Sequence, residues 1–548
     1  MNRKEFAEFL LGKTEHTKDE YEKMYPERNL DEGAIVTRFA PSPTGFVHIG
    51  SLFASFIASR FAKQTNGVFY LRIEDTDGKR TVENGVSNII RDLKNFNINF
   101  DEGMTSDTSE EGSYGPYLQS NRKDIYNAYA KDLIERDLAY PCFLSEEEME
   151  DIRSMQEDIK ARIGIYGKYA KYRNLSVDEA IEKIKNGERY IIRLKSPGEF
   201  NNKIIVDDVI RGRLEFNEND MDIVIIKGDG LPTYHFAHAI DDHLMRTTHV
   251  IRGDEWISSL PLHVQLFDVL GFKAPKYLHI SPLMKKDNGN VRKISKRKDA
   301  EAAVNYYHEE GIPTYAVLLY LMTVANSNFE AWLDENPNGK IDDFNLTFDK
   351  MSSSGSLFDM EKLLNISKNY ISRLTKDEVY DMALKYTKEY DKELYDLLVK
   401  YEDYSKGVFN IEREGVKPRK DLAKFSEIRS YLWYMYDELY KPENYEFMNI
   451  TDEVEISNIL KTYMEKYYNV DDKDTWFSNI KLLADELGYA SNMKEYKANP
   501  DAFKGNVADI ATVLRVSLTS KSQTPDLYEI MRLFGRDRVL NRYNKFIK

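Results

Sequence analysis

The sequence has very little cysteine: Cys142 is the single one among 548 residues. A lone cysteine cannot form an internal disulfide, so the chain is not a disulfide-stabilised secreted scaffold, and this usage fits a reducing compartment. No apolar run approaches the roughly 18 residues that a membrane helix needs. The apolar stretch near the N-terminus is too short and too interrupted for a signal peptide. These absences predict a multidomain, cytoplasmic protein without membrane association.

An excess of positive charge is missing as well. Lys and Arg number 77 against 92 Asp and Glu, which gives a net charge of −15 at pH 7. Proteins that bind nucleic acid usually carry a basic footprint, so the overall charge argues mildly against such a partner. A local basic stretch is formed by Arg515, Lys521, Arg532, Arg536, Arg538, Arg542, Lys545 and Lys548. On charge alone an ordinary solvated helical face explains this stretch slightly better than RNA binding does.

The Walker pattern GxxxxGK[ST] is absent, which disfavours a P-loop ATPase. Residues 38–50, RFAPSPTGFVHIG, instead place a proline- and glycine-containing turn after an apolar strand, followed by a histidine and a glycine at an expected helix start. Free N–H groups and the helix dipole favour anions at such a start. Gly50 would let a nucleotide approach the backbone, and His48 would donate to a phosphate oxygen. An isolated HIG tripeptide is usually only a turn cap, so the preceding strand and turn carry this prediction.

A second segment, KISKR at 293–297, follows a strand candidate and an Asp-Asn-Gly-Asn turn. Lys293 and Lys296 would neutralise the charge that grows on a triphosphate as it is attacked. A lysine-rich turn alone is usually a solvated loop, so the specificity of this one comes from its pairing with residues 38–50. Together the two segments resemble the HIGH and KMSKS signatures of class I aminoacyl-tRNA synthetases.

The surrounding residues narrow this resemblance to the bacterial-type glutamyl-tRNA synthetases. The runs RFAPSPTG at 38–45, LRIEDTD at 71–77 and GLPTYHFAHAIDDHLMRTTHVIRGDEW at 230–256 look like patterns of that family. Glutaminyl enzymes share the fold but typically read RFPPEPNG at the first run, so Ala40 and the residues after it favour glutamate. Weaker matches continue to the C-terminus, where FDMEKL at 358–363 and LRVSLT at 514–519 look like family motifs of the helical region.

The resemblance implies three groups of site residues. The expected catalytic residues are His48, Gly50, Lys293 and Lys296. The expected glutamate-binding residues are Arg38, Ala40, Ser42, Glu74, Tyr234, His238 and Arg252. The expected ATP-binding residues are Pro43, Thr44, His48, Ser51, Glu255, Trp256, Met284, Lys293, Ser295, Lys296 and Arg297. Within the pocket, Arg38 would pair with the substrate side-chain carboxylate with help from Arg252, and Glu74 would accept from the α-ammonium.

The predicted fold is α/β: a Rossmann-like parallel nucleotide-binding sheet with an α+β insertion, followed by an all-α C-terminal anticodon-binding region. The first part is predicted from the strand–turn–helix–strand order after residue 34, in which the apolar residues of the helix recur at helical spacing, at Leu52, Phe53, Phe56, Ile57 and Phe61. A helix over 260–270 and a strand over 277–284 are expected in its second half. The second part is predicted from the almost wholly helical pattern of the last third. The expected divisions are an N-terminal extension without identified chemistry (1–33), catalytic halves (34–115 and 229–288), an inserted acceptor-binding domain (116–228), a KMSKS loop with a helical stem-contact domain (289–372) and an anticodon-binding domain (373–548).

The implied activity is that of a glutamate–tRNA ligase. The glutamate α-carboxylate would attack the ATP α-phosphate, and a ribose hydroxyl of the tRNA 3′-terminal adenosine would then attack the adenylate. Mg²⁺ would be held largely by the nucleotide. No zinc site is expected, because Cys142 supplies only one soft ligand where some relatives carry Cys-x-Cys. The expected partners are ATP, L-glutamate and tRNA(Glu), with tRNA(Gln) open as a second acceptor, and the chain is expected to be a monomer.

Two other functions compete with this interpretation. A nucleotidyltransferase of the same superclass without a tRNA substrate would not need the long helical C-terminal part. A catalytically silent RNA-binding paralogue would not need His48, Gly50, Lys293 and Lys296 intact. Glutamate-dependent exchange of pyrophosphate into ATP distinguishes the silent paralogue from the ligase.

Overall fold

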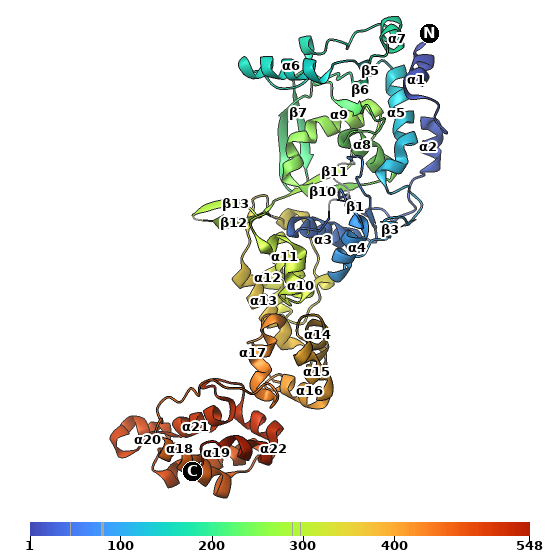
Figure 1. Ribbon diagram of the computed structural model, residues 1–548. Helices are drawn as coiled ribbons and strands as arrows, with labels where there is room; N and C mark the ends of the chain where they lie inside the picture. Colours follow the sequence, from blue (N-terminus) through green and yellow to red (C-terminus); the bar gives the residue numbers. More distant parts are fainter. Residues whose placement is uncertain (44, 78–81, 288, 296, 416) are drawn as a thin grey trace. The chain divides into compact units, whose positions relative to one another are not determined.

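The computed structural model describes residues 1–43, 45–77, 82–287, 289–295, 297–415 and 417–548. Thr44 and Lys296, two of the predicted site residues, therefore lie outside the described residues. The chain forms two compact units, drawn in Figure 1. The first contains Met1–Tyr307 and Val317–Asp359, and the second contains His308–Ala316 and Met360–Lys548.

The first unit is built on a mainly parallel sheet in two halves, with strand orders β1-β2-β3-β4 and β10-β11-β7-β8, in which only the edge pairs β3–β4 and β7–β8 of the described strands are antiparallel. The strands of the first half are β1 (Val36–Phe39), β2 (Val68–Leu71), β3 (Glu102–Met104) and β4 (Glu110–Glu111). Those of the second half are β7 (Lys203–Asp208), β8 (Gly212–Asn217), β10 (His249–Gly253) and β11 (Lys276–Ile280). The halves meet where the N–H of Thr248, next to β10, donates to the carbonyl of Val36 in β1 at 2.9 Å. The pairs β1–β2, β2–β3 and β10–β11 are all parallel, which confirms the predicted Rossmann-like core.

Helix α3 (Ile49–Gln64) connects β1 to β2 and shows why this unit forms. Five of its apolar side chains recur at helical spacing, and all five are buried: Leu52, Phe53, Phe56, Ile57 and Phe61. Further helices of the unit are α4 (Gly85–Asn95), α5 (Lys123–Glu135), α8 (Tyr234–Leu244) and α9 (Leu260–Leu270). The last of these has the bounds expected from the sequence. A βαβ unit with a buried crossover helix places the carboxyl ends of its strands at one edge.

The insertion has its own antiparallel sheet of β5 (Ala139–Cys142), β6 (Ile191–Leu194) and β9 (Val224–Ile226), with helices α6 (Glu146–Asp158) and α7 (Val177–Lys185). One of its hairpins behaves differently. Strand β7 pairs with β11 of the nucleotide sheet, through Asp208 opposite Tyr277. The β7–β8 hairpin, which the sequence places inside the insertion, thus extends the edge of the nucleotide sheet.

The N-terminal residues form two capped helices, α1 (Arg3–Leu11) and α2 (Lys18–Met24), which pack against α5. Arg28 donates to both carboxylate oxygens of Glu102 at 2.8 and 3.0 Å. His243, at the end of α8, lies 2.9 Å from Glu22. The extension is therefore an integral part of the first unit.

After β11 the first unit continues with the β12 (Leu283–Asp287) and β13 (Asn290–Lys293) hairpin, the short strand β14 (Ser356–Leu357) and helices α10 (Val304–Glu309), α11 (Thr314–Ala325) and α12 (Phe329–Glu335). The single strand predicted over 277–284 is divided in two at Ser281-Pro282, where proline cannot donate to a ladder. Residues 308 and 309 of α10 and residues 314–316 of α11 belong to the second unit.

The second unit is helical, as predicted. Its main helices are α13 (Met360–Arg373), α14 (Lys376–Tyr390), α15 (Lys392–Lys400), α16 (Glu402–Asn410), α17 (Ile428–Leu432), α18 (Glu453–Thr462), α19 (Lys473–Leu487), α20 (Met493–Ala498), α21 (Val507–Thr519) and α22 (Leu527–Tyr543). All of these helices except α20 contribute to one apolar core, which includes Leu460, Ile480, Leu514 and Met531. Throughout the described ranges, no helix has both the length and the apolar surface that a bilayer crossing requires.

Candidate active site

A cavity of about 600 Å³ lies at the carboxyl ends of β1 and β10, where the two halves of the sheet meet. This is the switch point at which open parallel sheets bind ligands. Twelve of the predicted site residues line it: Arg38, Ala40, Ser42, His48, Gly50, Ser51, Glu74, Tyr234, Arg252, Glu255, Trp256 and Lys293. Of the predicted residues that the structure describes, Pro43, His238, Met284, Ser295 and Arg297 are not in its wall.

The turn after β1 carries the chain from the sheet edge to the start of α3. Gly45 adopts a φ of 110°, a conformation that side chains disfavour. His48 is the N-cap of α3, and its Nδ1 accepts the N–H of Ser51 at 3.1 Å. Because Nδ1 accepts, the ring proton resides on Nε2, the nitrogen that could donate to a phosphate. His48 is thus a helix cap, as the simpler interpretation of HIG held, and it also lines the cavity.

Gly50 makes room for this imidazole. A Cβ at position 50 would lie 2.8 Å from Cε1 and 3.1 Å from Nδ1 of His48. A side chain there would push the ring out of its capping position. The glycine therefore fixes the placement of His48, in addition to the close nucleotide approach expected from the sequence.

The β12–β13 hairpin brings the second motif to the same cavity. Lys293, at the end of β13, donates to Glu255 at 3.1 Å, and both residues line the cavity with His48. The loop that follows is tied down by Asp299, whose carboxylate accepts two hydrogen bonds from Arg292, at 2.6 and 2.8 Å, and one from the N–H of Ser295 at 2.9 Å. Residues far apart in the sequence thus meet around one space.

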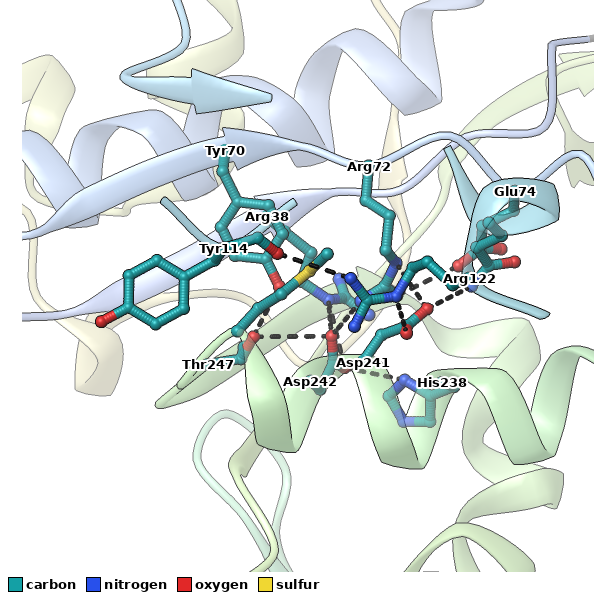
Figure 2. Close-up of polar contacts among 12 residues, drawn as sticks. Arg38, Tyr70, Arg72, Glu74, Tyr114, Arg122, His238, Asp241, Asp242 and Thr247 are labelled. Carbon is teal, nitrogen blue, oxygen red and sulfur yellow. Dashed lines mark hydrogen bonds and ion pairs between the residues drawn. The ribbon is translucent and has the colours of Figure 1, made fainter. Parts of the chain in front are cut away.

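Beneath the cavity, three buried arginines converge on two adjacent aspartates of α8 (Figure 2). Arg72 donates to Asp242 at 2.6 Å, Arg38 directs Nε at the same carboxylate at 3.3 Å, and Arg122 donates to Asp241 at 2.7 Å. Burial opposes ionisation of Asp242, but Arg38 and Arg72 hold its pKa well below the usual value. The aspartate therefore stays charged and fixes the Arg38 side chain at the cavity wall.

Glu74 follows β2 and faces the cavity. Burial raises its pKa to about 7, although Arg72, which donates to it at 3.2 Å, and Arg38 act in the opposite direction. An acidic group poised near neutrality in a cavity is typical of a functional site. A ligand cation at this carboxylate would return its pKa toward the normal range.

Arg252 differs from the other buried arginines. It is only 6% exposed, lines the cavity and makes no ion pair with any residue that the structure describes. Its Nε donates to Nε2 of His279 at 3.0 Å, and its Nη1 lies 3.1 Å from Nδ1 of His263. Its Nη2 is buried and has no hydrogen-bond partner among the described groups. Burying a cation without a counter-charge costs free energy, so an anion bound beside Arg252 would be stabilised.

Aromatic rings complete the wall. The Tyr234 and Trp256 rings lie 4.5 Å apart, and burial raises the pKa of Tyr234 to about 12, so it stays a phenol donor. His238, predicted to contact the substrate, instead lies fully buried behind Tyr234, its ring roughly parallel at 5.9 Å. Its Nδ1 lies 2.7 Å from the Asp242 carboxylate and its Nε2 lies 3.2 Å from the Tyr277 hydroxyl.

Several residues that shape this site were not among the sequence-based predictions. Arg72, Asp241 and Asp242 lie inside the matched runs 71–77 and 230–256, so the motifs contained a signal for them. For His263 and His279 the only signal in the sequence was that they are histidines. Asp208, which accepts from His279, gave no sequence signal, because its contact depends on the pairing of β7 with β11.

Comparison with known proteins agrees with this geometry. The family described as "tRNA synthetases class I (E and Q), catalytic domain" matches residues 34–389. The chain belongs to this family. A second family, described as "Anticodon binding domain", matches residues 378–547. Membership of the class I synthetases implies ATP as a substrate and confirms the expectation of an aminoacyl-tRNA ligase.

Individual relatives agree with the family match. The chain is 51% identical to a glutamate–tRNA ligase of Clostridium perfringens (strain SM101 / Type A), with both chains covered completely. It is 49% identical to that of Clostridium beijerinckii, again over both full lengths. A solved glutamate tRNA ligase from Elizabethkingia meningosepticum, in complex with its amino acid, is similar with a TM-score of 0.75 at 26% identity, covering 93% of this chain and 99% of that one.

Proposed function

We propose that this class I synthetase is a glutamate–tRNA ligase. It activates L-glutamate with ATP to glutamyl-adenylate and transfers the glutamyl group to the 3′-terminal adenosine of tRNA(Glu). Relatives named glutamate–tRNA ligase are 51% and 49% identical to this chain over their full length, which supports this activity. The helical C-terminal unit and the anticodon-binding match at 378–547 support tRNA as a partner.

The observation that carries the choice of glutamate is the unpaired Arg252 in the wall that also contains Arg38 and Glu74. Glutamate has two carboxylates and one ammonium group. Two guanidinium groups and one carboxylate equal that set in number and carry the opposite charges. A planar guanidinium also suits a carboxylate by geometry. Arg38 already pairs with Asp242, so glutamine, with its neutral side chain, would leave Arg252 without an anion from the side-chain end of the ligand.

In the proposed complex, Arg38 and Arg252 hold the carboxylates, Glu74 accepts from the α-ammonium, and Ser42 and Tyr234 add polar contacts. Ala40 gives a small wall at the pocket. The nucleotide lies against His48, Ser51, Glu255, Trp256 and Lys293, which line the same cavity. The further nucleotide contacts expected at Pro43, Met284, Ser295 and Arg297 lie outside the cavity wall and belong to the proposal through the family resemblance.

The chemistry then needs no covalent enzyme intermediate. The α-carboxylate attacks the α-phosphate, and the N-terminus of α3, His48 and Lys293 stabilise the negative charge on the phosphate oxygens. Lys293 would leave Glu255, its present partner at 3.1 Å, for the phosphates. The other lysine of the motif, Lys296, has the same proposed role.

Mg²⁺ would enter with the nucleotide and be held mainly by its phosphates. The described residues contain no group of three or more His, Cys, Asp or Glu side chains that could hold a metal ion by themselves. We include in the proposal a monomeric chain, as the default state, and a cytoplasmic location, which the single cysteine supports.

Pyrophosphate exchange tests the proposal directly. We expect incorporation of labelled pyrophosphate into ATP that depends on L-glutamate and on added tRNA, with L-glutamine inactive. A chain that binds tRNA but gives no exchange with or without tRNA would be a silent RNA-binding paralogue. Charging assays with purified tRNA(Glu) and tRNA(Gln) then decide which acceptors are used.

A further inference from the structure

Arg252 is held by imidazoles on both sides. His279, at the end of β11, receives Nε–H at 3.0 Å, and His263, on α9, lies 3.1 Å from Nη1. Arg38, Arg72 and Arg122 are all held by carboxylates instead. The difference in partner decides how much of each arginine's charge is left for a ligand.

The hydrogen bonds around Asp208 fix the tautomer of His279. Asp208 accepts the N–H groups of Ile210 and Arg211 with one oxygen, at 3.0 and 2.8 Å. Its other oxygen accepts the N–H of His279 at 3.1 Å and lies 2.7 Å from Nδ1 of the same residue. Burial opposes ionisation, yet these bonds hold the pKa of Asp208 below its usual value. Nδ1 of His279 must therefore carry the proton, and Nε2 presents a lone pair to Arg252.

The second imidazole is fixed in the opposite sense. Nδ1 of His263 faces Nη1 of Arg252, which can only donate, so Nδ1 must accept. The proton of His263 then lies on Nε2, which is 2.8 Å from Nδ1 of His235. Burial lowers the pKa of His263 well below its usual value, and the nearby Arg252 adds to this. Burial also lowers the pKa of His279, despite Asp208, and that of His235 to about 4. All three rings are neutral near pH 7.

We propose that His263 and His279 are positioning residues that hold Arg252 through neutral acceptors, so that its guanidinium keeps its full charge and presents Nη2 to a carboxylate of the substrate. The inference rests on the proposed function, because it concerns the same amino-acid pocket. A carboxylate in place of either imidazole would hold the arginine equally well in geometry. It would also cancel the charge on which the substrate depends.

Amide substitutions test this placement because they can imitate one ring nitrogen at a time. The oxygen of asparagine can occupy the place of Nδ1, and that of glutamine the place of Nε2. Arg252 uses Nδ1 of His263 but Nε2 of His279. We therefore expect His263→Asn to keep the KM for glutamate within about threefold of the original and His263→Gln to raise it about tenfold or more. At position 279 we expect the reverse order: His279→Gln should keep the KM for glutamate near the original value, and His279→Asn should raise it.

The measurement is tRNA-supported pyrophosphate exchange with glutamate and ATP varied separately. The KM for ATP should stay within about twofold in the His279 variants. In the His263 variants it should change less than the KM for glutamate, because the His263 ring also lies 6.5 Å from the ring of Trp256, a proposed nucleotide contact. His249→Asn and His249→Gln are matched controls. His249 is also buried on β10, but it contacts Thr248 at 2.9 Å and stacks near Phe348, away from Arg252. Neither control should shift the KM for glutamate.

The reversed order separates a positioning role from ordinary core packing. If the same amide is preferred at both positions, or if none of the four variants shifts the KM for glutamate, the inference is wrong while the proposed function stands. If the original protein shows no glutamate-dependent exchange, the proposed function is wrong, and the inference is wrong as well because it rests on that function. Should one position fail to yield folded protein, judged by thermal melting and tRNA binding, the order of the two variants at the other position decides.

Discussion

Replacing Arg252 by glutamine is the most direct test of how this pocket uses charge. The substitution removes a buried cation that makes no ion pair among the described residues, so no carboxylate is left uncompensated. Hydrogen bonds to charged groups contribute about 1.5–3 kcal/mol. At 1.4 kcal/mol for each factor of ten, the expected rise in KM for glutamate is about 10- to 150-fold. The free energy of unfolding should change little, because removing an uncompensated buried charge offsets the loss of its two hydrogen bonds to His263 and His279.

Arg72→Gln is the contrasting variant. Arg72 is fully buried and pairs with Asp242 at 2.6 Å and with Glu74 at 3.2 Å. Breaking a buried pair from one side leaves the other charge uncompensated and costs about 3–5 kcal/mol. This variant should therefore lose stability as well as activity. The two arginines lie near the same cavity, yet one substitution is expected to affect mainly binding and the other mainly folding.

The assay combines pyrophosphate exchange at varied glutamate with chemical denaturation of both variants. Arg252→Gln must raise the KM for glutamate, leave the KM for ATP near its original value and unfold near the original denaturant midpoint. If it destabilises the chain as strongly as Arg72→Gln does, Arg252 is a structural residue. If the KM for glutamate is unchanged, the unpaired guanidinium does not bind the substrate. Either result would refute the reasoning.

Three further predictions concern other parts of the site. Because burial raises the pKa of Glu74 to about 7 and the ammonium of glutamate needs the ionised form, KM for glutamate should fall as pH rises from about 6 to 8, and Glu74→Gln should give a higher, flat profile. A flat profile in the original protein would contradict this role. Gly50→Ala places a Cβ 2.8 Å from Cε1 of His48 and should slow exchange about tenfold or more with the fold retained, as melting would show. Asp299→Asn weakens the bidentate contact with Arg292 and should lower kcat of exchange about tenfold without changing the KM for glutamate; a change in KM alone would contradict a loop role.

The parts of the fold that the sequence predicts well are local. The strand, turn and helix over 36–64 follow from a contiguous apolar pattern and from the glycine and proline of the turn, and the structure confirms them. Helix α9 has the predicted bounds for the same reason. The pairing of β7 with β11 could not be predicted, because a single residue pair joins strands separated by some 70 positions and no local pattern encodes it.

The same distinction applies to the site. Motif resemblance identifies positions such as Arg38, Glu74 and Arg252, and the structure places all three in one cavity wall. It does not say which way a side chain points: His238 was expected beside the substrate, yet it lies buried behind Tyr234. Partners such as Asp208 depend on tertiary contacts and were missed. Sequence motifs therefore give the residues of first contact more readily than the residues that orient them.

The partners of the buried arginines suggest how one pocket combines stability with a demand for an anion. Desolvating a guanidinium is costly, and Asp241 and Asp242 offset that cost for Arg38, Arg72 and Arg122 within the protein itself. Arg252 receives the lone pairs of two neutral rings and lies 4.8 Å from the centroid of the Tyr277 ring, and these neutral contacts leave its charge uncancelled. An anionic ligand completes the compensation, so part of the energy of binding comes from a charge imbalance already built into the fold. In the proposed complex a neutral amide side chain would not supply that compensation, and we expect the same imbalance to disfavour glutamine.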